Sequence, residues 1–179
     1  LAELINSSEK VTIYCGLGAK DAHDEAVQLA EKIKAPIGYS FKSKMAIQYE
    51  NPYEVGITGL LGMPSAFSAM HESDLLILLG TDFPYTSFMP TKTKIVQIDI
   101  KPEHIGRRAK VDIGLGGDIK DTLTALLPFI DEKTDNSFLK KQLQLYSKVK
   151  EYLFSIAMKK GSENNIAPEY VTMVIDKLA

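Results

Sequence analysis

Short aliphatic runs that alternate with helical segments limit the possible folds of this sequence more than any other feature. The run Leu75–Leu79 (LLILL) contains no polar residue and is followed by a glycine. Comparable runs occupy Val11–Cys15 and Lys94–Ile100. Strands without polar alternation are buried on both faces, which is typical of a parallel sheet covered by helices. The sequence therefore predicts a three-layer α/β fold with a parallel sheet between two layers of helices.

The remaining elements follow from periodicity and from residues that favour helix starts. Two more short strands are expected at Pro36–Tyr39 and Asp112–Leu115. Helices are expected at Asp24–Ile33, Ser65–His71, Ile119–Phe129, Phe138–Met158 and Pro168–Leu178. Asp118 is suited to cap the third of these helices, and Pro168 is suited to the first turn of the last one.

The composition changes after Phe129, and this change indicates the domain organisation. Polar segments at Asp131–Ser137 and Lys159–Ala167 flank the long helical stretch. We expect a binding domain over residues 1–130, a helical linker over 131–167 and the start of a further domain over 168–179. The sequence begins without Met inside one helical pattern and stops inside another, so we interpret it as a fragment of a longer protein.

Composition and charge argue against several classes of function. The net charge is -2 and no basic run is present, so no nucleic-acid partner is expected. Cys15 is the single cysteine, which rules out an internal disulfide, and no apolar stretch reaches the length of a membrane span. We therefore expect a cytoplasmic protein. The three histidines and Cys15 show no metal-binding spacing, and no catalytic residue is assigned.

Glycines, small polar residues and acids follow several of the expected strands. These segments are Gly16–Ala19, Lys42–Lys44, Gly80–Tyr85, Asp99 and Gly117–Asp118. In parallel α/β sheets the ligand lies beyond the carboxyl ends of the strands, and all of these segments share that edge. The pattern as a whole predicts a binding site there.

Taken singly, these motifs leave alternatives open. The turn Gly16-Leu17-Gly18 either presents N–H groups to a phosphate or is a tight turn without a ligand, and Asp21 stands where a dinucleotide fingerprint has its third glycine. No acid follows the second strand, which counts against an NAD site. Asp99 either accepts hydrogen bonds from ribose hydroxyls or is a turn acid, and Cys15 is interpreted as a core residue.

Three segments together carry a family resemblance: KAPIGYSFKSK, QYENPYEVGITGLLG, and the long stretch that begins LLILLGTDFPYTSF and ends DTLTALLP. They resemble the middle domain of thiamine-diphosphate-dependent pyruvate oxidases, in particular the quinone-linked branch that forms acetate. The resemblance covers nearly the whole chain. It implies a six-stranded parallel sheet that binds FAD, located between a pyrimidine-binding domain and a pyrophosphate-binding domain.

The resemblance also implies which residues contact the cofactor. Thr58–Leu61 and Thr81–Tyr85 would line FAD, Asp99 would hold the adenosine portion, and the glycine turns would lie near the phosphates and ribose. The full set of expected cofactor-binding residues is Gly16, Gly18, Ala19, Lys42, Thr58, Gly59, Leu60, Leu61, Gly80, Thr81, Asp82, Phe83, Pro84, Tyr85, Asp99, Ile100, Gly117 and Asp118. Lys42-Ser43 departs from the Arg-Gly pair frequent in the family, and lysine lacks the planar fork of arginine.

The parent enzyme implied by the resemblance decarboxylates pyruvate oxidatively with thiamine diphosphate and Mg²⁺, and passes electrons to FAD and then to a quinone or oxygen. The thiamine and metal sites would lie in domains outside this sequence, so the fragment alone is expected to be inactive. The resemblance implies a homotetrameric parent, with membrane attachment in some members through a C-terminal segment that this sequence does not contain.

Three alternatives remain open at this level. An acetolactate-synthase-like enzyme would keep FAD in this domain without using it for redox chemistry. A nucleotide-binding module of the NAD type would contain no flavin, and the missing acid after the second strand argues against it. A purely structural middle domain would have lost the cofactor, and the cluster of polar residues at the strand ends argues against that.

Overall fold

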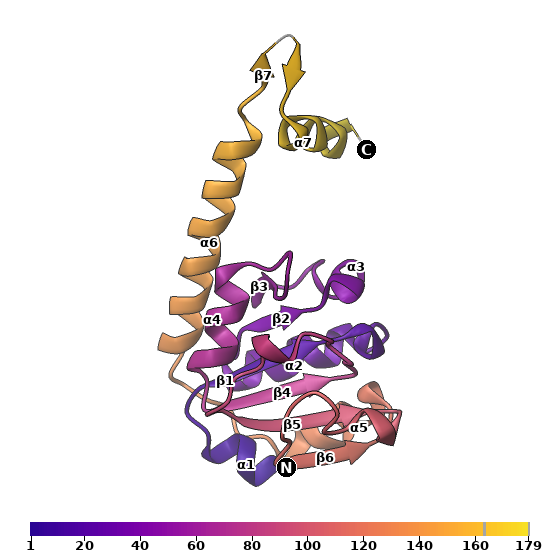
Figure 1. Cartoon of the computed structure of the whole chain (residues 1–179). Helices are drawn as coiled ribbons and strands as arrows, with labels where there is room; N and C mark the ends of the chain where they lie inside the picture. Colours follow the sequence, from indigo (N-terminus) through magenta and orange to yellow (C-terminus); the bar gives the residue numbers. More distant parts are fainter. Residues whose placement is uncertain (163, 179) are drawn as a thin grey trace.

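The computed structural model describes residues 1–162 and 164–178 and contains a six-stranded parallel sheet with helices on both faces (Figure 1). The strand order is β3-β2-β1-β4-β5-β6. The strands are β1 (Val11–Cys15), β2 (Ile37–Tyr39), β3 (Glu54–Ile57), β4 (Leu75–Leu79), β5 (Lys94–Asp99) and β6 (Ile113–Gly116). The predicted α/β class, the parallel sheet and its six strands are confirmed.

Helices cover the sheet in two layers. One layer consists of α1 (Ala2–Ser7), α2 (His23–Ile33) and α5 (Ile119–Leu126). The other consists of α4 (Pro64–Glu72) and the first part of α6 (Ser137–Ala157). Short elements complete the body: α3 (Lys44–Ile47) and the 3-10 helices η1 (Leu17–Ala19), η2 (Phe41–Ser43), η3 (Thr86–Phe88), η4 (Pro102–His104) and η5 (Leu127–Phe129).

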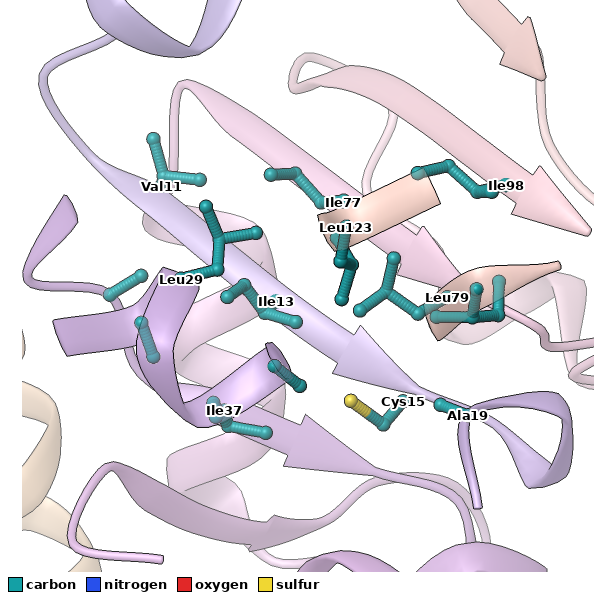
Figure 2. Close-up of a cluster of buried hydrophobic side chains, with 14 of the residues drawn as sticks. Val11, Ile13, Cys15, Ala19, Leu29, Ile37, Ile77, Leu79, Ile98 and Leu123 are labelled. Carbon is teal, nitrogen blue, oxygen red and sulfur yellow. The ribbon is translucent and has the colours of Figure 1, made fainter. Parts of the chain in front are cut away.

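Alternate residues of the central strands form two separate parts of the core. Ile13 of β1 lies beside Ile77 of β4 in the parallel register, and both pack toward α2 and α5 with Leu29 and Leu123 (Figure 2). The intervening residues, among them Leu76 and Leu78, form a second cluster on the α4 side. Both faces of β4 are therefore buried, which explains why its sequence has no polar residue.

Helix α6 connects the sheet to the C-terminal elements. Its first half packs on α4 and β3 through buried Leu139, Gln142 and Tyr146, and Lys141 Nζ lies 2.5 Å from Glu72 Oε2. Its second half extends away from the sheet toward the C-terminal elements (Figure 1). These elements are the hairpin of β7 (Gly161–Ser162) and β8 (Asn165–Ile166) and the helix α7 (Pro168–Leu178).

Most element predictions agree with the structure, and the exceptions have physical causes. β1 and β4 are found at their predicted bounds, and Asp118 caps α5 by accepting a hydrogen bond from Asp121 N at 3.1 Å. β3 was not predicted because its sequence is short and contains Gly56 at φ +87. The hairpin β7–β8 lies inside the segment expected to be linker. Residue 163 of the predicted linker and residue 179 of the predicted final segment lie outside the described residues. The division of the chain into domains stays a prediction.

The turn after β1 and the turn after β4 touch through their backbones. A Cβ atom placed on Gly16 would lie 2.3 Å from Gly80 O and 2.5 Å from Thr81 Cα. Gly80 has φ +56, a left-handed conformation, and a Cβ on it would lie 2.6 Å from Gly18 Cα. Gly16 N donates to Leu79 O at 2.8 Å, and Gly18 N donates to Gly80 O at 2.9 Å. These glycines therefore allow two loops to approach each other.

Replacing Gly16 with alanine tests this contact. We expect Gly16→Ala to lower the free energy of unfolding by about 2 kcal/mol or more, because backbone atoms that have no room to move would overlap with the new methyl group. Urea denaturation followed by circular dichroism measures the change. Gly116→Ala is the matched control: its Cβ would meet Pro102 Cγ at an ordinary 3.5 Å. Equal effects of the two substitutions would contradict this account.

Candidate functional site

A cleft of about 910 Å³ lies beyond the carboxyl ends of the sheet strands. Its walls come from η1, the segment after β2, the loop after β3, the loop after β4 and the segment after β5. Ligand pockets for small molecules and cofactors fall in this size range. The cleft is therefore large enough for a dinucleotide-sized ligand, and it occupies the edge at which the sequence predicts one.

The structure brings most of the predicted site residues together in this cleft. Those that line it are Gly18, Lys42, Thr58, Leu60, Leu61, Gly80, Thr81, Asp82, Phe83, Pro84, Tyr85, Asp99 and Ile100. Those that do not line it are Gly16, Ala19, Gly59, Gly117 and Asp118. The backbone of Gly117 instead donates to Asp99 O at 3.0 Å, and the carboxylate of Asp118 caps α5. Ligand contact by each member of the predicted set stays a prediction.

Eight further residues line the cleft and were not predicted: Leu17, Lys20, Ser40, Phe41, Ile57, Lys101, His104 and Arg108. Several of them flank predicted residues, so a wider window at each strand end would have included them. Arg108 is different, because it stands 9 residues after the end of β5 (from 99 to 108). Only the return of that loop to the edge of the sheet places it in the cleft.

The amides of the glycine turn are already bonded within the protein. The N–H groups of Gly16 and Gly18 donate to Leu79 O and Gly80 O. The sequence left two interpretations of this turn open, a phosphate cradle and a tight turn. Because both amides have protein acceptors, the structure supports the second interpretation for these two N–H groups.

Apolar side chains form one wall and the rim of the cleft. Phe83 is only 5% exposed and packs edge-on against Tyr14, with the ring centroids 5.6 Å apart. Tyr85 packs edge-on against Phe83 and is 38% exposed. Both rings line the cleft, where Phe83 supports the wall and Tyr85 is the more accessible of the two. Large exposed side chains at the rim are Leu17, Phe41, Leu60, Leu61 and Ile100.

Asp99 is buried at the end of β5 and keeps part of its carboxylate free. Oδ1 accepts a hydrogen bond from Lys101 N at 2.9 Å. Oδ2 lies 3.6 Å from His104 Nδ1, which also faces the cleft. A carboxylate oxygen has more than one acceptor position, so Asp99 can still accept hydrogen bonds from hydroxyl groups of a ligand.

Asp82 has its carboxylate held by two arginines. Arg108 Nε donates to Oδ1 at 2.9 Å, and Arg107 Nη2 lies 3.1 Å from Oδ2. The hydrogen bond from Arg108 lowers the pKa of the Asp82 carboxyl below its usual range, and Arg107 and His104 add electrostatic contributions in the same direction. Asp82 is therefore ionised at neutral pH and already paired.

Gln97 joins the two loops that carry these residues. Its side-chain Nε2 donates to Thr81 O at 3.3 Å and to His104 O at 3.1 Å, and its Oε1 accepts from Gly106 N at 2.9 Å. The residue is only 4% exposed. A buried side chain with three backbone partners fixes the loop after β4 relative to the loop after β5.

Thr58 presents a buried hydroxyl without a partner. Its residue is 6% exposed, it lines the cleft, and no hydrogen-bond partner of Oγ1 exists among the described residues. Buried polar groups are nearly always hydrogen-bonded, so an unpaired one in a cleft indicates a group that a ligand or water completes.

The charges of the cleft favour an anionic ligand. The basic residues that line it are Lys20, Lys42, Lys101 and Arg108, and the acidic ones are Asp82 and Asp99. A ligand with an apolar ring system, hydroxyl groups and an anionic centre matches this combination of walls. FAD, the cofactor that the family resemblance implies, has these three parts, and the unpaired Thr58 hydroxyl and the cleft volume fit it.

Two kinds of feature are absent from the part of the chain that the structure describes. No group of three or more His, Cys, Asp or Glu side chains there could hold a metal ion. No helix among residues 1–162 and 164–178 combines the length and apolar character that a membrane crossing requires.

Comparison with known proteins identifies a family model and several relatives. Residues 1–126 match the model described as "Thiamine pyrophosphate enzyme, central domain". A crystal structure described as a thiamin diphosphate-dependent enzyme from Mycobacterium smegmatis superimposes with a TM-score of 0.61 and 25% identity, over 75% of this chain and 27% of that chain.

The curated relatives include one uncharacterized protein and two enzymes with different names. An uncharacterized 42.6 kDa protein of Pseudomonas amyloderamosa is 49% identical over 86% of this chain and 39% of its own. Pyruvate oxidase of Lactiplantibacillus plantarum is 26% identical over 100% of this chain and 30% of its own. Acetolactate synthase isozyme 1 large subunit of Escherichia coli is 27% identical over 73% of this chain and 24% of its own. The chain thus spans less than half the length of these relatives.

The unpaired Thr58 hydroxyl can be tested with a matched pair of threonines. We expect Thr58→Val to change the free energy of unfolding by less than about 0.5 kcal/mol, because no hydrogen bond is lost. Thr12→Val should cost about 1–2 kcal/mol, because Thr12 Oγ1 donates to Ala69 O at 2.7 Å in the core. Urea denaturation of both variants without ligand measures the difference. A larger loss at position 58 would show that its hydroxyl has a protein partner.

The ion pairs of Asp82 predict a pH dependence of stability. The pKa of Asp82 is lowered in the folded chain. Its contribution to the free energy of unfolding is therefore complete above the pKa of the unfolded chain, about 3.9, and is lost as the pH falls through the pKa of the folded chain. We therefore expect Asp82→Asn to have a free energy of unfolding about 0.5–1 kcal/mol lower than that of wild type at pH 7. The loss is this small because the Asp82 side chain is 29% exposed and solvent screens its ion pairs. The difference should shrink below pH 4.

Denaturation of both proteins at pH 7, 4 and 3 measures this dependence. Asp21→Asn is the control, since its pair with Lys20 spans 3.8 Å and its side chain is 82% exposed. That substitution should produce no measurable change at any of the three pH values. A constant difference between wild type and Asp82→Asn across the series would contradict the prediction.

Proposed function

Since the chain belongs to the family of central domains of thiamine pyrophosphate enzymes, we propose that it is the FAD-binding central domain of a pyruvate oxidase. The observation that carries the proposal is the cleft at the carboxyl edge of the sheet, which combines a buried acid, an unpaired hydroxyl, basic groups and an apolar wall. The resemblance to pyruvate oxidases in the sequence and the match to the L. plantarum enzyme support it.

The cleft contains a suitable group for each part of FAD. Asp99 would accept hydrogen bonds from the hydroxyls of the adenosine ribose. The basic residues would face the diphosphate, and the accessible Tyr85 and Leu60 would contact apolar rings. Thr58 would use its free hydroxyl on a polar atom of the ligand. Thr81, buried beside Gly80, would border the same part of the cleft.

The chain's own task in the parent enzyme would be to bind and orient the cofactor and to exclude water from part of it. Bound FAD would supply an acceptor for the electrons released when pyruvate is decarboxylated. The thiamine diphosphate and Mg²⁺ sites would lie in other domains. We accordingly expect the chain alone to lack activity toward pyruvate.

Acetolactate synthase activity is the second candidate, and the match to the E. coli enzyme favours it. Both candidates would use this cleft for FAD, so binding alone does not separate them. Incubation of the full-length parent with pyruvate does: bleaching of the flavin absorption without oxygen would support an oxidase. Formation of acetolactate without bleaching would support the synthase.

The remaining expectations about the parent follow from the same proposal. We propose a homotetrameric parent that acts in the cytoplasm on pyruvate and has no nucleic-acid partner.

Titration of the purified chain with FAD tests the proposed function. We expect saturable quenching of flavin fluorescence, and no saturable binding of NAD in a calorimetric titration. Asp99→Asn should weaken FAD binding roughly 5- to 50-fold, because a charge-assisted hydrogen bond to the ribose would be lost. Asp112→Asn is the matched control: Asp112 also accepts a backbone N–H, from Ile95 at 2.8 Å, but does not line the cleft.

Each outcome of the titration has a definite meaning. Binding of NAD with an affinity equal to that of FAD would favour a general nucleotide module. Failure of FAD to bind both to this chain and to the full-length parent would overturn the proposal. Equal losses in the two aspartate variants would remove Asp99 from the binding site.

A further inference from the structure

The Asp82 carboxylate is paired with two arginines that lie next to each other in the sequence. Arg108 contacts Oδ1 at 2.9 Å and Arg107 contacts Oδ2 at 3.1 Å. One negative charge faces two positive charges, so the group carries a net positive charge. The side chains of Asp82 and Arg108 are each 29% exposed, while that of Arg107 is 46% exposed.

The two arginines differ in their relation to the cleft. Arg108 lines it and Arg107 does not. Arg108 donates to Asp82 through Nε, which leaves the two Nη groups at the end of its fork. Within residues 1–162 and 164–178, no hydrogen bond from those Nη groups is found. Arg108 therefore has planar N–H donors without a protein partner, and it lines both this cleft and a second pocket beside Lys94 and Ile95.

We propose that Arg108 binds the diphosphate of the nucleotide ligand and that Asp82 is a positioning residue that holds Arg108, not a ligand contact. This inference rests on the proposed function, since it concerns the same cleft. It reassigns Asp82, which the sequence placed among the cofactor-binding residues. It also adds Arg108, which the sequence did not indicate.

The chemistry of the pair agrees with this assignment. A guanidinium matches the oxygens of a phosphate in a planar, bidentate arrangement. An unpaired carboxylate at the same wall would repel a diphosphate, but the two arginines more than neutralise the charge of Asp82. Because its pKa is lowered, Asp82 stays ionised at neutral pH and continues to accept the hydrogen bond from Arg108 Nε.

The loops that carry the pair are fixed to each other. Buried Gln97 binds Thr81 O on the Asp82 side and both His104 O and Gly106 N on the Arg108 side. The separation of Asp82 from Arg108 is thus set before a ligand enters. Such pre-organisation reduces the entropy that binding costs.

Comparison of ADP with adenosine isolates the contribution of the phosphates. Calorimetric titrations of the purified chain at one ionic strength give the ratio of the two affinities. We expect Arg108→Gln to lower the preference for ADP over adenosine roughly 10- to 100-fold, the range for a charge-assisted contact. Arg107→Gln is the matched control, with the same change of charge and the same acid partner. It should lower the preference less than about threefold, because exposed charges are screened.

Two further variants separate positioning from folding. Arg108→Lys keeps the charge but loses the fork, so it should retain only part of the preference for ADP. If Asp82 acts through Arg108, Asp82→Asn should change the preference for ADP over adenosine in the wild-type chain. The same substitution should leave that preference unchanged in a chain that already carries Arg108→Gln. A merely structural role for Asp82 would give the same change in both backgrounds.

The results can overturn the inference without overturning the proposed function. Three results would each refute it. The first is an equal preference for ADP in wild type and Arg108→Gln, and the second is an equal effect of Arg107→Gln and Arg108→Gln. The third is a wild-type chain without any preference for ADP. FAD titration of the wild-type chain judges the proposed function separately. Binding of FAD together with an unchanged ADP preference in Arg108→Gln would keep the function and remove the role of Arg108.

Discussion

The backbone contact between the turns after β1 and β4 is the constraint on which the cleft depends. Gly80 lies against Gly18, and Gly16 lies against Gly80 O with no space for a side chain. β1 and β4 are paired along their whole length, and the contact keeps the turns that follow them close while the loops after β3, β4 and β5 border one cavity. The glycines of such a turn therefore need not bind phosphate in order to be required.

The polar groups around the cleft fall into two sets with different roles. Gln97 and Asp82 use their side chains on neighbouring protein groups and fix the loops. Thr58, Asp99 and the Nη end of Arg108 retain donors or acceptors that the protein leaves available. A site built in this way can be rigid in the absence of ligand and still be incomplete, which is the condition for tight and selective binding.

The sequence predicts the fold more fully than it predicts the site. Aliphatic runs such as Leu75–Leu79 locate strands because burial on both faces demands them, whereas β3 has only four residues and includes Gly56. Most of the predicted residues after β2, β3, β4 and β5 reach the cleft because parallel strands end at one edge, whereas Gly16, Gly117 and Asp118 follow β1 and β6 and do not line it. The partner of a side chain depends on how a loop returns, so neither the pairing of Asp82 nor the place of Arg108 could be read from spacing alone.

Cys15 illustrates a consequence of ending a strand inside the hydrophobic core. It is fully buried one residue before the glycine turn, among the side chains of Figure 2, and burial raises the pKa of its thiol to about 12. At neutral pH the thiol is therefore protonated, whereas the thiolate is the nucleophile that reacts with peroxides and disulfides. The fold thus keeps the sulfur of the chain's single cysteine in its unreactive form.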